Sequence, residues 1–315
     1  MKLRHSKAAA YMAAIGYATI IGFSFLFVKQ TVTMANPLDV LAHRFLLGFA
    51  AVGIPFLFGW IRFSFSLRDI WRLLPLGLLS PVLFFALQAY GLLSASSSEA
   101  GIILAMVPLL TTPFAAFFLK ERTSSIQKLF ILLSVSGVVY IFVMKGGAGW
   151  SEDNLSGLIL LLLSALSLAG YSVLARPLTK KYTPVEIALV TMGMGFVIFN
   201  VAALFRHGAA GDMEAFLKPF TEPQYVLALM YLGILSSLGS TLLSNYALSQ
   251  LEASKVSVFN NLSTIISMLA GALILQEKLT SAHLIGTFLI IVGVLGTNMG
   301  RVRVKNRPAA KEFDA

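Results

Sequence analysis

The sequence contains no cysteine, and charged residues are scarce in it. Without cysteine the chain forms no disulfide, thiolate metal site or cysteine nucleophile. Charged residues make up 12% of the sequence and hydrophobic residues 57%, whereas a typical soluble domain is roughly 25% charged. The mean hydropathy is correspondingly high, at +0.82. This composition excludes a soluble enzyme, a disordered tail and a nucleic-acid binder, and it indicates an integral membrane protein.

Ten apolar runs without Lys, Arg, Asp or Glu follow one another along the chain. A membrane-spanning helix needs roughly 20 apolar residues, whereas a barrel strand is about half as long and alternates in polarity. The runs therefore predict an all-α membrane protein with ten transmembrane helices. They are Ala8–Val28, Phe45–Ile61, Leu73–Ser98, Ala100–Leu119, Leu129–Met144, Asn154–Ala175, Ile187–Phe205, Pro223–Leu251, Val256–Gln276 and Leu279–Gly300.

The basic residues predict the orientation of these helices. If both termini are cytoplasmic, 18 Lys and Arg residues lie in cytoplasmic segments and 5 in external ones, with Arg44 at a membrane boundary. Cytoplasmic loops of membrane proteins carry such an excess of positive charge. We therefore expect a multi-pass protein of a bacterial-type inner membrane, with both termini and a basic tail at 301–315 in the cytoplasm.

The second half of the chain repeats the first. A shift of 156 residues places Tyr90 on Tyr246, and a shift of 147 places Pro37 on Pro184. The extra residues belong to the polar stretch 206–222, between the seventh and eighth runs. Each repeat then holds five helices, and this odd number makes the second copy cross the membrane in the opposite direction. Inverted repeats are characteristic of alternating-access transporters, which bind substrate near the midplane of the membrane.

Each predicted repeat closes its fourth helix on a Leu-x-Glu-Arg/Lys pattern that contains Glu121 or Glu277. The first repeat also contains, in order, Gly22, Ser24, Lys29, Pro37 and Arg44. With the duplication, these features resemble the drug/metabolite transporter superfamily, and its EamA-type ten-helix exporters in particular. The resemblance implies two inverted EamA-like repeats, at 8–145 and 154–300. It also implies transport of small metabolites, without identifying the cargo.

The sequence shows no pattern typical of an enzyme. The four histidines are scattered without a metal-binding spacing, and no acidic residue lies inside an apolar run. The glycine-rich stretch at 146–149 opens no phosphate-binding helix after a strand. We therefore expect neither catalysis nor a metal or other cofactor.

Polar and aromatic residues inside the runs are the candidates for substrate binding. An amide that faces lipid leaves its donors and acceptors unsatisfied, so it must face other helices or a hydrated cavity. Asn260 and Asn261 point about 100° apart on a helix, so we expect at least one of them to reach a cavity. Pro108 and Thr111 are expected to form a kinked, hydrogen-bonding wall. The predicted substrate-binding residues are Ser24, Phe27, Gln88, Tyr90, Pro108, Thr111, Tyr171, Asn245, Asn260 and Asn261.

Charged residues near the ends of the runs are candidates for gating or charge pairing. Arg44 is interpreted as an outer gate or as a pairing site for a carboxylate on the cargo. The alternative is an interfacial arginine that snorkels outward or pairs with Asp39. Lys29 and Arg176 occupy one repeat position and either anchor their helices at the interface or frame the path. Glu121 and Glu277 are interpreted as pairing with a neighbouring basic residue, with gating as the alternative.

These features predict a secondary transporter that moves a small amphipathic metabolite, such as an amino acid, by alternating access and exports it. An exchanger of organic anions or phosphorylated metabolites is the alternative if Lys29, Arg44 and Arg176 line the path. A non-transporting membrane scaffold is the alternative from another class. The expected partners are a small-molecule substrate and the lipid bilayer. The glycines of the last run also allow close approach of a second copy in a homo-oligomer.

Overall fold

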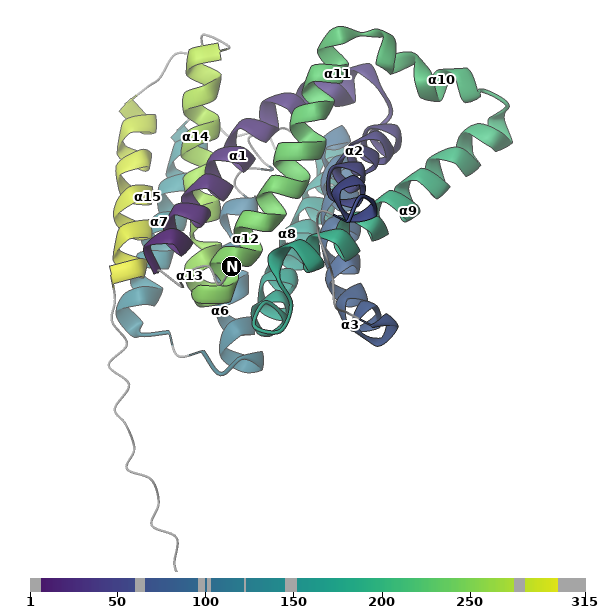
Figure 1. The fold of residues 1–315 in the computed structure, drawn as a ribbon. Helices are drawn as coiled ribbons and strands as arrows, with labels where there is room; N and C mark the ends of the chain where they lie inside the picture. Colours follow the sequence, from purple (N-terminus) through teal and green to yellow (C-terminus); the bar gives the residue numbers. More distant parts are fainter. Residues whose placement is uncertain are drawn as a thin grey trace, which may run out of the picture.

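The computed structural model describes residues 7–59, 66–95, 100, 103–121, 123–144, 152–274 and 281–299, and the regular structure in these ranges is entirely helical (Figure 1). The first half contains α1 (Lys7–Met34), α2 (Pro37–Leu57), α3 (Leu67–Gly77), the π-helix η1 (Leu78–Leu83), α4 (Phe84–Ser94), α6 (Val107–Phe118) and α7 (Ser125–Met144). The second half contains α8 (Glu152–Leu178), α9 (Pro184–Ala210), α10 (Met213–Leu217), the 3-10 helix η2 (Lys218–Thr221), α11 (Pro223–Met230), the π-helix η3 (Tyr231–Gly239), α12 (Ser240–Gln250), α13 (Ala253–Ser257), α14 (Phe259–Ile274) and α15 (Ser281–Met299).

Six helical segments in the described ranges are long and apolar enough to cross a membrane. They are Lys7–Met34, Pro37–Leu57, Arg68–Ser94, Leu155–Leu178, Pro184–Ala210 and Pro223–Gln250. Shorter apolar helices at Ile103–Phe118, Ser125–Ile141 and Leu284–Thr297 coincide with other predicted runs. The chain is therefore a multi-pass, helical membrane protein, and the more detailed ten-helix inverted repeat stays a prediction.

Helix α2 begins at Pro37, whereas the second predicted run begins at Phe45. The side chain of Asn36 accepts a backbone hydrogen bond of the first turn, and proline suits the first helical position. Asp39 and Arg44 consequently lie inside the helix and are buried in the bundle. The predicted start at Phe45, directly after the charged Arg44, was wrong, because the side chains of Asp39 and Arg44 both find polar partners among the packed helices.

The polar stretch 206–222 is folded rather than an open connection. Helix α9 continues to Ala210 and ends at Gly211, whose φ of +70° lies in the left-handed region that glycine adopts easily. The short helices α10 and η2 follow, and the side chain of Phe216 on α10 is buried. The stretch thereby lies against the start of α2 instead of extending into solvent.

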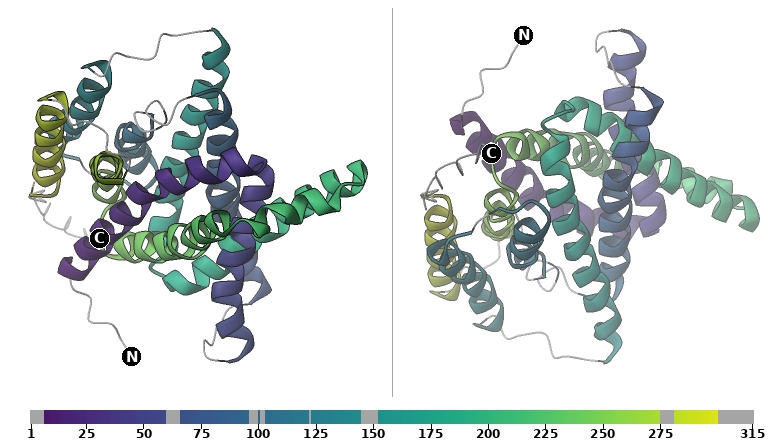
Figure 2. Two further views of the ribbon diagram at one scale, coloured as in Figure 1. Left: turned by 90° about the horizontal axis from the view of Figure 1, so that it is seen from above. Right: turned by 90° about the horizontal axis from the view of Figure 1, so that it is seen from below.

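The main helix contacts join the first half of the chain to the second. Helix α1 packs against α12 and α14, α2 against α9, α4 against α8, and α7 against α15. Both views in Figure 2 show α7 and α15 side by side at one edge of the molecule. Glycine permits this approach, since a Cβ at Gly137 would lie 2.7 Å from the carbonyl oxygen of Gly286. The glycines of the last helix thus serve packing within the chain.

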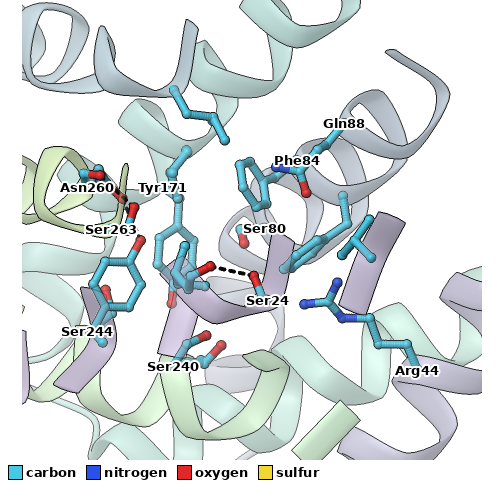
Figure 3. Close-up of a pocket in the computed structure, with 17 residues that line it drawn as sticks. Ser24, Arg44, Ser80, Phe84, Gln88, Tyr171, Ser240, Ser244, Asn260 and Ser263 are labelled. Carbon is cyan, nitrogen blue, oxygen red and sulfur yellow. Dashed lines mark hydrogen bonds between the residues drawn. The ribbon is translucent and has the colours of Figure 1, made fainter. Parts of the chain in front are cut away.

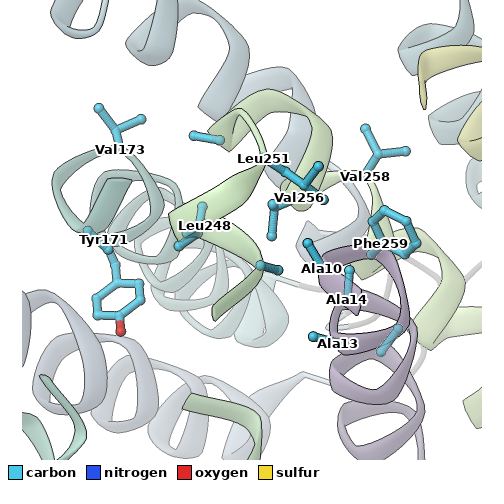
Figure 4. Close-up of a cluster of buried hydrophobic side chains, with 14 of the residues drawn as sticks. Ala10, Ala13, Ala14, Tyr171, Val173, Leu248, Leu251, Val256, Val258 and Phe259 are labelled. Atoms are coloured by element: carbon cyan, nitrogen blue, oxygen red, sulfur yellow. The ribbon is translucent and has the colours of Figure 1, made fainter. Parts of the chain in front are cut away.

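Small residues also let α1 approach its neighbours closely (Figure 4). Ala10, Ala13 and Ala14 are buried and belong to one apolar cluster with Leu248 of α12 and Phe259 of α14. Lipid is as apolar as these side chains, so close van der Waals packing, rather than exclusion from water, holds the helices together.

Two π-helical segments occur at matched positions of the sequence duplication. The shift of 156 residues places Leu78–Leu83 on the last six residues of Tyr231–Gly239. In η1, Ser80 has non-helical φ and ψ of −146° and 119° and precedes a cis peptide bond to Pro81. Such local departures from the α-helix are frequent at functional sites. Ser80 of η1 lines the pocket described next, and so does Ser240, the first residue after η3.

Candidate functional site

A narrow pocket lies between helices of both halves of the chain (Figure 3). Its cavity volume of about 60 Å³ has room for about four water molecules at roughly 15 Å³ each. Small-molecule sites usually enclose roughly 300–1,000 Å³, so the helices must separate to admit a metabolite. The lining residues are Tyr17, Ile21, Ser24, Val28, Arg44, Ser80, Phe84, Phe85, Gln88, Leu104, Leu168, Tyr171, Ser240, Thr241, Ser244, Asn260 and Ser263.

Most lining residues come in pairs that the sequence duplication matches. The shift of 147 residues relates Ile21 to Leu168 and Ser24 to Tyr171, and the shift of 156 relates Gln88 to Ser244. The shift of 156 also relates Phe84 to Ser240, Phe85 to Thr241 and Leu104 to Asn260. In these last pairs the first half supplies an apolar side chain and the second half a polar one. The pocket therefore has an apolar wall and a polar wall.

Of the predicted binding residues, Ser24, Gln88, Tyr171 and Asn260 line this pocket. Ser24 comes from α1, Gln88 from α4, Tyr171 from α8 and Asn260 from α14, so four separate helices bring them together. Tyr17, Ser80, Thr241 and Ser263 were not predicted. Their sequence contexts carry no signal that separates them from packing residues.

Hydrogen bonds within the bundle hold three of the polar lining residues in place. The Tyr17 hydroxyl donates to Asn260 Oδ1 over 2.8 Å, and Asn260 Nδ2 donates to the Ser257 carbonyl oxygen over 2.8 Å. The Tyr171 hydroxyl lies 3.0 Å from Oδ1 and 2.7 Å from Nδ2 of Asn245, which is fully buried behind it. These amides orient the two tyrosines, and Asn245 itself does not reach the pocket.

Gln88 differs from these amides, because its carboxamide forms no hydrogen bond with the described residues. The side chain is 8% exposed and faces the pocket, where Figure 3 shows it on the side of Arg44. A buried carboxamide keeps unused donors and acceptors only where water or a ligand can reach them. Gln88 is therefore one of the polar groups of the pocket whose side chain has no hydrogen-bond partner among the described residues.

Other predicted binding residues lie outside the pocket lining. The ring of Phe27 stacks on Tyr231 with 4.4 Å between centroids, and Tyr90 is 41% exposed on the outer side of α4. Pro108 stands at the start of α6, and Thr111 returns its hydroxyl to the Val107 carbonyl oxygen over 2.9 Å. Asn261 Nδ2 donates to the Ser134 hydroxyl of α7 over 2.8 Å. Phe27 and Asn261 thus contact other helices, whereas the Thr111 hydroxyl bonds within its own helix.

Arg44 is buried within the helix bundle and is not paired with Asp39. It is 2% exposed and lines the pocket. Its Nε donates to the Ser237 hydroxyl over 2.6 Å and its Nη2 to the Ser236 hydroxyl over 2.9 Å. The guanidinium carbon is 4.1 Å from the centroid of the Phe85 ring, within the range of a cation–π interaction.

Asp39 instead belongs to a polar cluster at the start of α2. Its carboxylate accepts from Arg206 Nη2 over 2.7 Å and lies 3.1 Å from His207 Nε2. His207 Nδ1 is 2.7 Å from the Asp212 carboxylate. The sequence did not predict this cluster, because Asp39 lies 167 residues from Arg206 and 168 from His207. The only local signal was the Arg-His pair at the end of the seventh run.

His43 lies beside this cluster in an aromatic cage. Its ring centroid is 4.4 Å from those of Phe216 and Phe220, and its Nδ1 is 2.8 Å from the Tyr225 hydroxyl. The folded stretch between α9 and α11 thus covers the start of α2.

Of the other predicted gating residues, the structure describes the side chains of Glu121 and Arg176. Glu121 accepts hydrogen bonds from the backbone N–H of Ala253 and the hydroxyl of Ser254, both over 3.1 Å, and lies 3.9 Å from Arg176. It therefore joins the end of α6 to the start of α13 and lies beside a basic residue of α8, while its sequence neighbour Arg122 lies outside the described residues. Arg176 does not line the pocket. The side chain of Lys29 and all of Glu277 lie outside the described residues.

Comparison with known proteins gives the family context of this site. The sequence model of the EamA-like transporter family matches residues 8–143 and again 155–299. The chain is 50% identical over 306 residues to the uncharacterized transporter YcxC of Bacillus subtilis, covering 97% of this chain and 98% of that protein. It is 25% identical to a WAT1-related protein of Arabidopsis thaliana, over 81% of this chain and 74% of the relative.

A solved crystal structure has a similar fold. It aligns with a TM-score of 0.67 and 20% sequence identity, covering 93% of this chain and 98% of the other. At this identity the likeness concerns the fold alone. The relatives that share more sequence are named as transporters rather than enzymes. Because the family model matches nearly the whole length in two copies, the chain belongs to the EamA-like transporter family.

Proposed function

We propose that this membrane transporter is a secondary transporter that exports a small amphipathic metabolite, such as an amino acid, by alternating access through the central pocket. The paired lining of the pocket carries this proposal. Matched residues of the two halves face one another across it, which is the arrangement that alternating-access transporters use to expose one site to either side.

The helix contacts support the two inverted five-helix repeats on which this mechanism depends. If α1, α2, α4, α6 and α7 correspond to α8, α9, α12, α14 and α15, the contacts are symmetric. The contact of α1 with α14 corresponds to that of α8 with α6, and the contact of α1 with α12 to that of α8 with α4. The pairs α2–α9 and α7–α15 correspond to themselves. Two copies related by a twofold axis would produce this pattern.

The chemistry of the walls supports an amphipathic cargo. Phe84, Phe85 and Leu104 provide apolar surface, while the facing positions carry two hydroxyls and a carboxamide. Pockets of this kind bind the apolar body of a ligand by burial and orient its polar end with a few hydrogen bonds.

The charge distribution supports placement in a bacterial-type inner membrane with both termini in the cytoplasm. The excess of Lys and Arg in the segments assigned to the cytoplasm is the observation that favours this orientation. Export follows from the resemblance to EamA-type exporters. No ATP-binding loop occurs in the sequence, so an ion or substrate gradient is the proposed source of energy.

Counterflow in proteoliposomes tests the proposed transport. Vesicles loaded with unlabelled amino acids should accumulate labelled amino acid from outside only when they contain the protein. Replacing Gln88 with Ala should weaken apparent affinity several-fold, because one hydrogen bond to the ligand contributes about 0.5–1.5 kcal/mol. Leu93→Ala on the same helix is the matched control, since Leu93 is exposed outside the pocket.

A non-transporting scaffold would give a different result. No labelled compound from a broad panel of amino acids, organic acids and amines would then exchange across the vesicle membrane, although the protein is folded. That outcome would overturn the proposed function.

A further inference from the structure

Arg44 is the charged residue among those that line the pocket. It is the eighth residue of α2, about 10 Å along the helix axis from Pro37 at 1.5 Å per residue. The remaining lining residues are apolar, aromatic, hydroxyl or carboxamide side chains. One permanent positive charge is therefore held next to the cavity, well inside the bundle.

Arg44 has no carboxylate partner among the described residues. Other basic residues in or beside the bundle do have one: Arg206 lies 2.7 Å from Asp39, Arg176 3.9 Å from Glu121, and Lys255 3.0 Å from Glu252. Among the described residues Arg44 contacts two serine hydroxyls and the faces of the Phe85 and Phe45 rings, whose centroids lie 4.1 and 6.0 Å from its guanidinium carbon. These neutral groups compensate the loss of hydration without neutralising the charge.

A buried guanidinium cannot avoid the free-energy cost of losing its hydration by giving up its proton, because arginine stays protonated in proteins. Ionisable residues within membrane helices are therefore expensive and mark functional sites. The Nη1 atom of Arg44 forms no hydrogen bond with the described residues, and Figure 3 shows the guanidinium pointing toward Ser24 and the centre of the pocket. One donor edge of the cation thus remains available to a ligand.

We propose that Arg44 binds the anionic end of the transported substrate and that this substrate is a small monocarboxylate with an apolar body. The inference rests on the proposed function and specifies its substrate class. One cation without an acidic neighbour is neutralised by one carboxylate, whereas a phosphate dianion would leave excess negative charge in the pocket.

The rest of the pocket determines what else the substrate carries. The apolar body lies against Phe84 and Leu104, and the free carboxamide of Gln88 donates to the second carboxylate oxygen. No lining residue supplies a negative charge for an ammonium group. An amino acid is consequently bound through its carboxylate, and its amino group adds little affinity.

Three charge series test this directly on the wild-type protein in detergent. Each series keeps one body, phenyl, indolyl or isobutyl, and changes the end: the deaminated carboxylate, the amino acid, the primary amide and the amine. We expect the carboxylate to bind at least as tightly as the amino acid, and about tenfold or more tighter than the amide and the amine. Binding is measured by calorimetry and transport by counterflow.

Substitutions of Arg44 connect the preference to this residue. Arg44→Gln should reduce affinity for the carboxylate about 30-fold or more, as loss of a buried charge partner does, and leave the amide unaffected. Arg44→Lys should retain part of the preference, because it retains the charge. Arg72→Gln is the control, since Arg72 is exposed and lies outside the pocket.

The results separate the inference from the proposed function. Equal or tighter binding of the amide or amine in every series overturns the inference while leaving a transporter. An unchanged carboxylate preference in folded Arg44→Gln or Arg44→Lys overturns the role of Arg44. Failure of every compound in all series to bind or exchange overturns the proposed function itself. If Arg44→Gln does not fold, the wild-type series and Arg44→Lys still decide the question.

Discussion

Helix α9 is joined to the first half of the chain near both of its ends by an aspartate, and the two contacts differ in burial. Just before α9 begins, Lys181 Nζ and the Tyr182 hydroxyl donate to Asp69 Oδ1 over 2.8 and 2.6 Å. Near its other end, Arg206 and His207 contact Asp39.

The environments of the two aspartates determine what each contact contributes. The side chain of Asp39 is 5% exposed and that of its partner His207 3%, whereas the side chain of Asp69 is 16% exposed and that of its partner Lys181 53%. Water and salt screen an exposed ion pair, so it adds little to stability. Removing one partner of a buried ion pair is far more costly, because the other charge is left buried without its compensation. The contact at Asp39 is thus a fixed attachment, and the one at Asp69 is easily broken.

Replacing Asp39 with Asn should have the largest effect on stability. The substitution leaves Arg206 without a negative partner and removes one of the two carboxylates that contact buried His207. We expect the free energy of unfolding to fall by about 2 kcal/mol or more. Denaturant-induced unfolding in detergent, followed by circular dichroism, measures this loss.

Glu186→Gln is the control for this prediction, because the sequence duplication matches Glu186 to Asp39. Glu186 instead caps α9, where its carboxylate accepts from the backbone N–H of Thr183 over 2.8 Å. Glutamine can accept the same bond, so the loss should stay below about 1 kcal/mol. A loss equal to that of Asp39→Asn would contradict the distinction between the two positions.

Arg206→Gln should have an intermediate effect. The Arg206 side chain is 39% exposed, so water hydrates part of the gap, and Asp39 keeps its contact with His207. We expect a loss of about 1 kcal/mol, and a double-mutant cycle with Asp39→Asn should show coupling between the two residues. Strict additivity of the two losses would show that the short contact contributes nothing.

Lys181→Met should have the smallest effect, and its dependence on salt and pH identifies the cause. The hydrogen bond to Asp69, and next that to Tyr182, raise the pKa of Lys181. A raised pKa means that the contribution is complete below the ordinary lysine pKa of 10.5 and is lost as the pH rises through the higher folded value. The difference between wild type and variant should therefore be constant from about pH 6 to 9.

Salt should reduce the same difference, since the charges are exposed. Melting temperatures of both proteins at low and high ionic strength measure this. A difference that salt does not change would indicate that Lys181 acts through packing of its methylene chain rather than through its charge.

The helices were more predictable from the sequence than the site. Each predicted run coincides in large part with a described helical segment, because composition alone decides which residues can face lipid. Helix ends were less predictable: α2 extends beyond Arg44 since tertiary partners accept its charged residues. A prediction that ends each membrane helix at the nearest charged residue takes no account of polar partners that other parts of the chain supply to that residue.

The position of a residue along a helix predicts the direction in which its side chain points, but not which groups it meets in the folded protein. Asn260 and Asn261 point different ways, as expected, and one lines the pocket while the other bonds to Ser134 of α7. Nothing local distinguishes them. Tyr90, close in sequence to Gln88, lies on the exposed side of the same helix. These assignments depend on neighbours more than 100 residues away.

Hydrophobicity and the duplication are properties of the chain, so they alone identify a multi-pass helical membrane protein of the EamA-like transporter family. Which polar groups face the pocket and which serve packing depends on how the helices pack together. The physical reason is that a buried polar group must be satisfied wherever it lies. The packing of the helices places Arg206 against Asp39, whereas it leaves one edge of the Arg44 guanidinium open to the pocket.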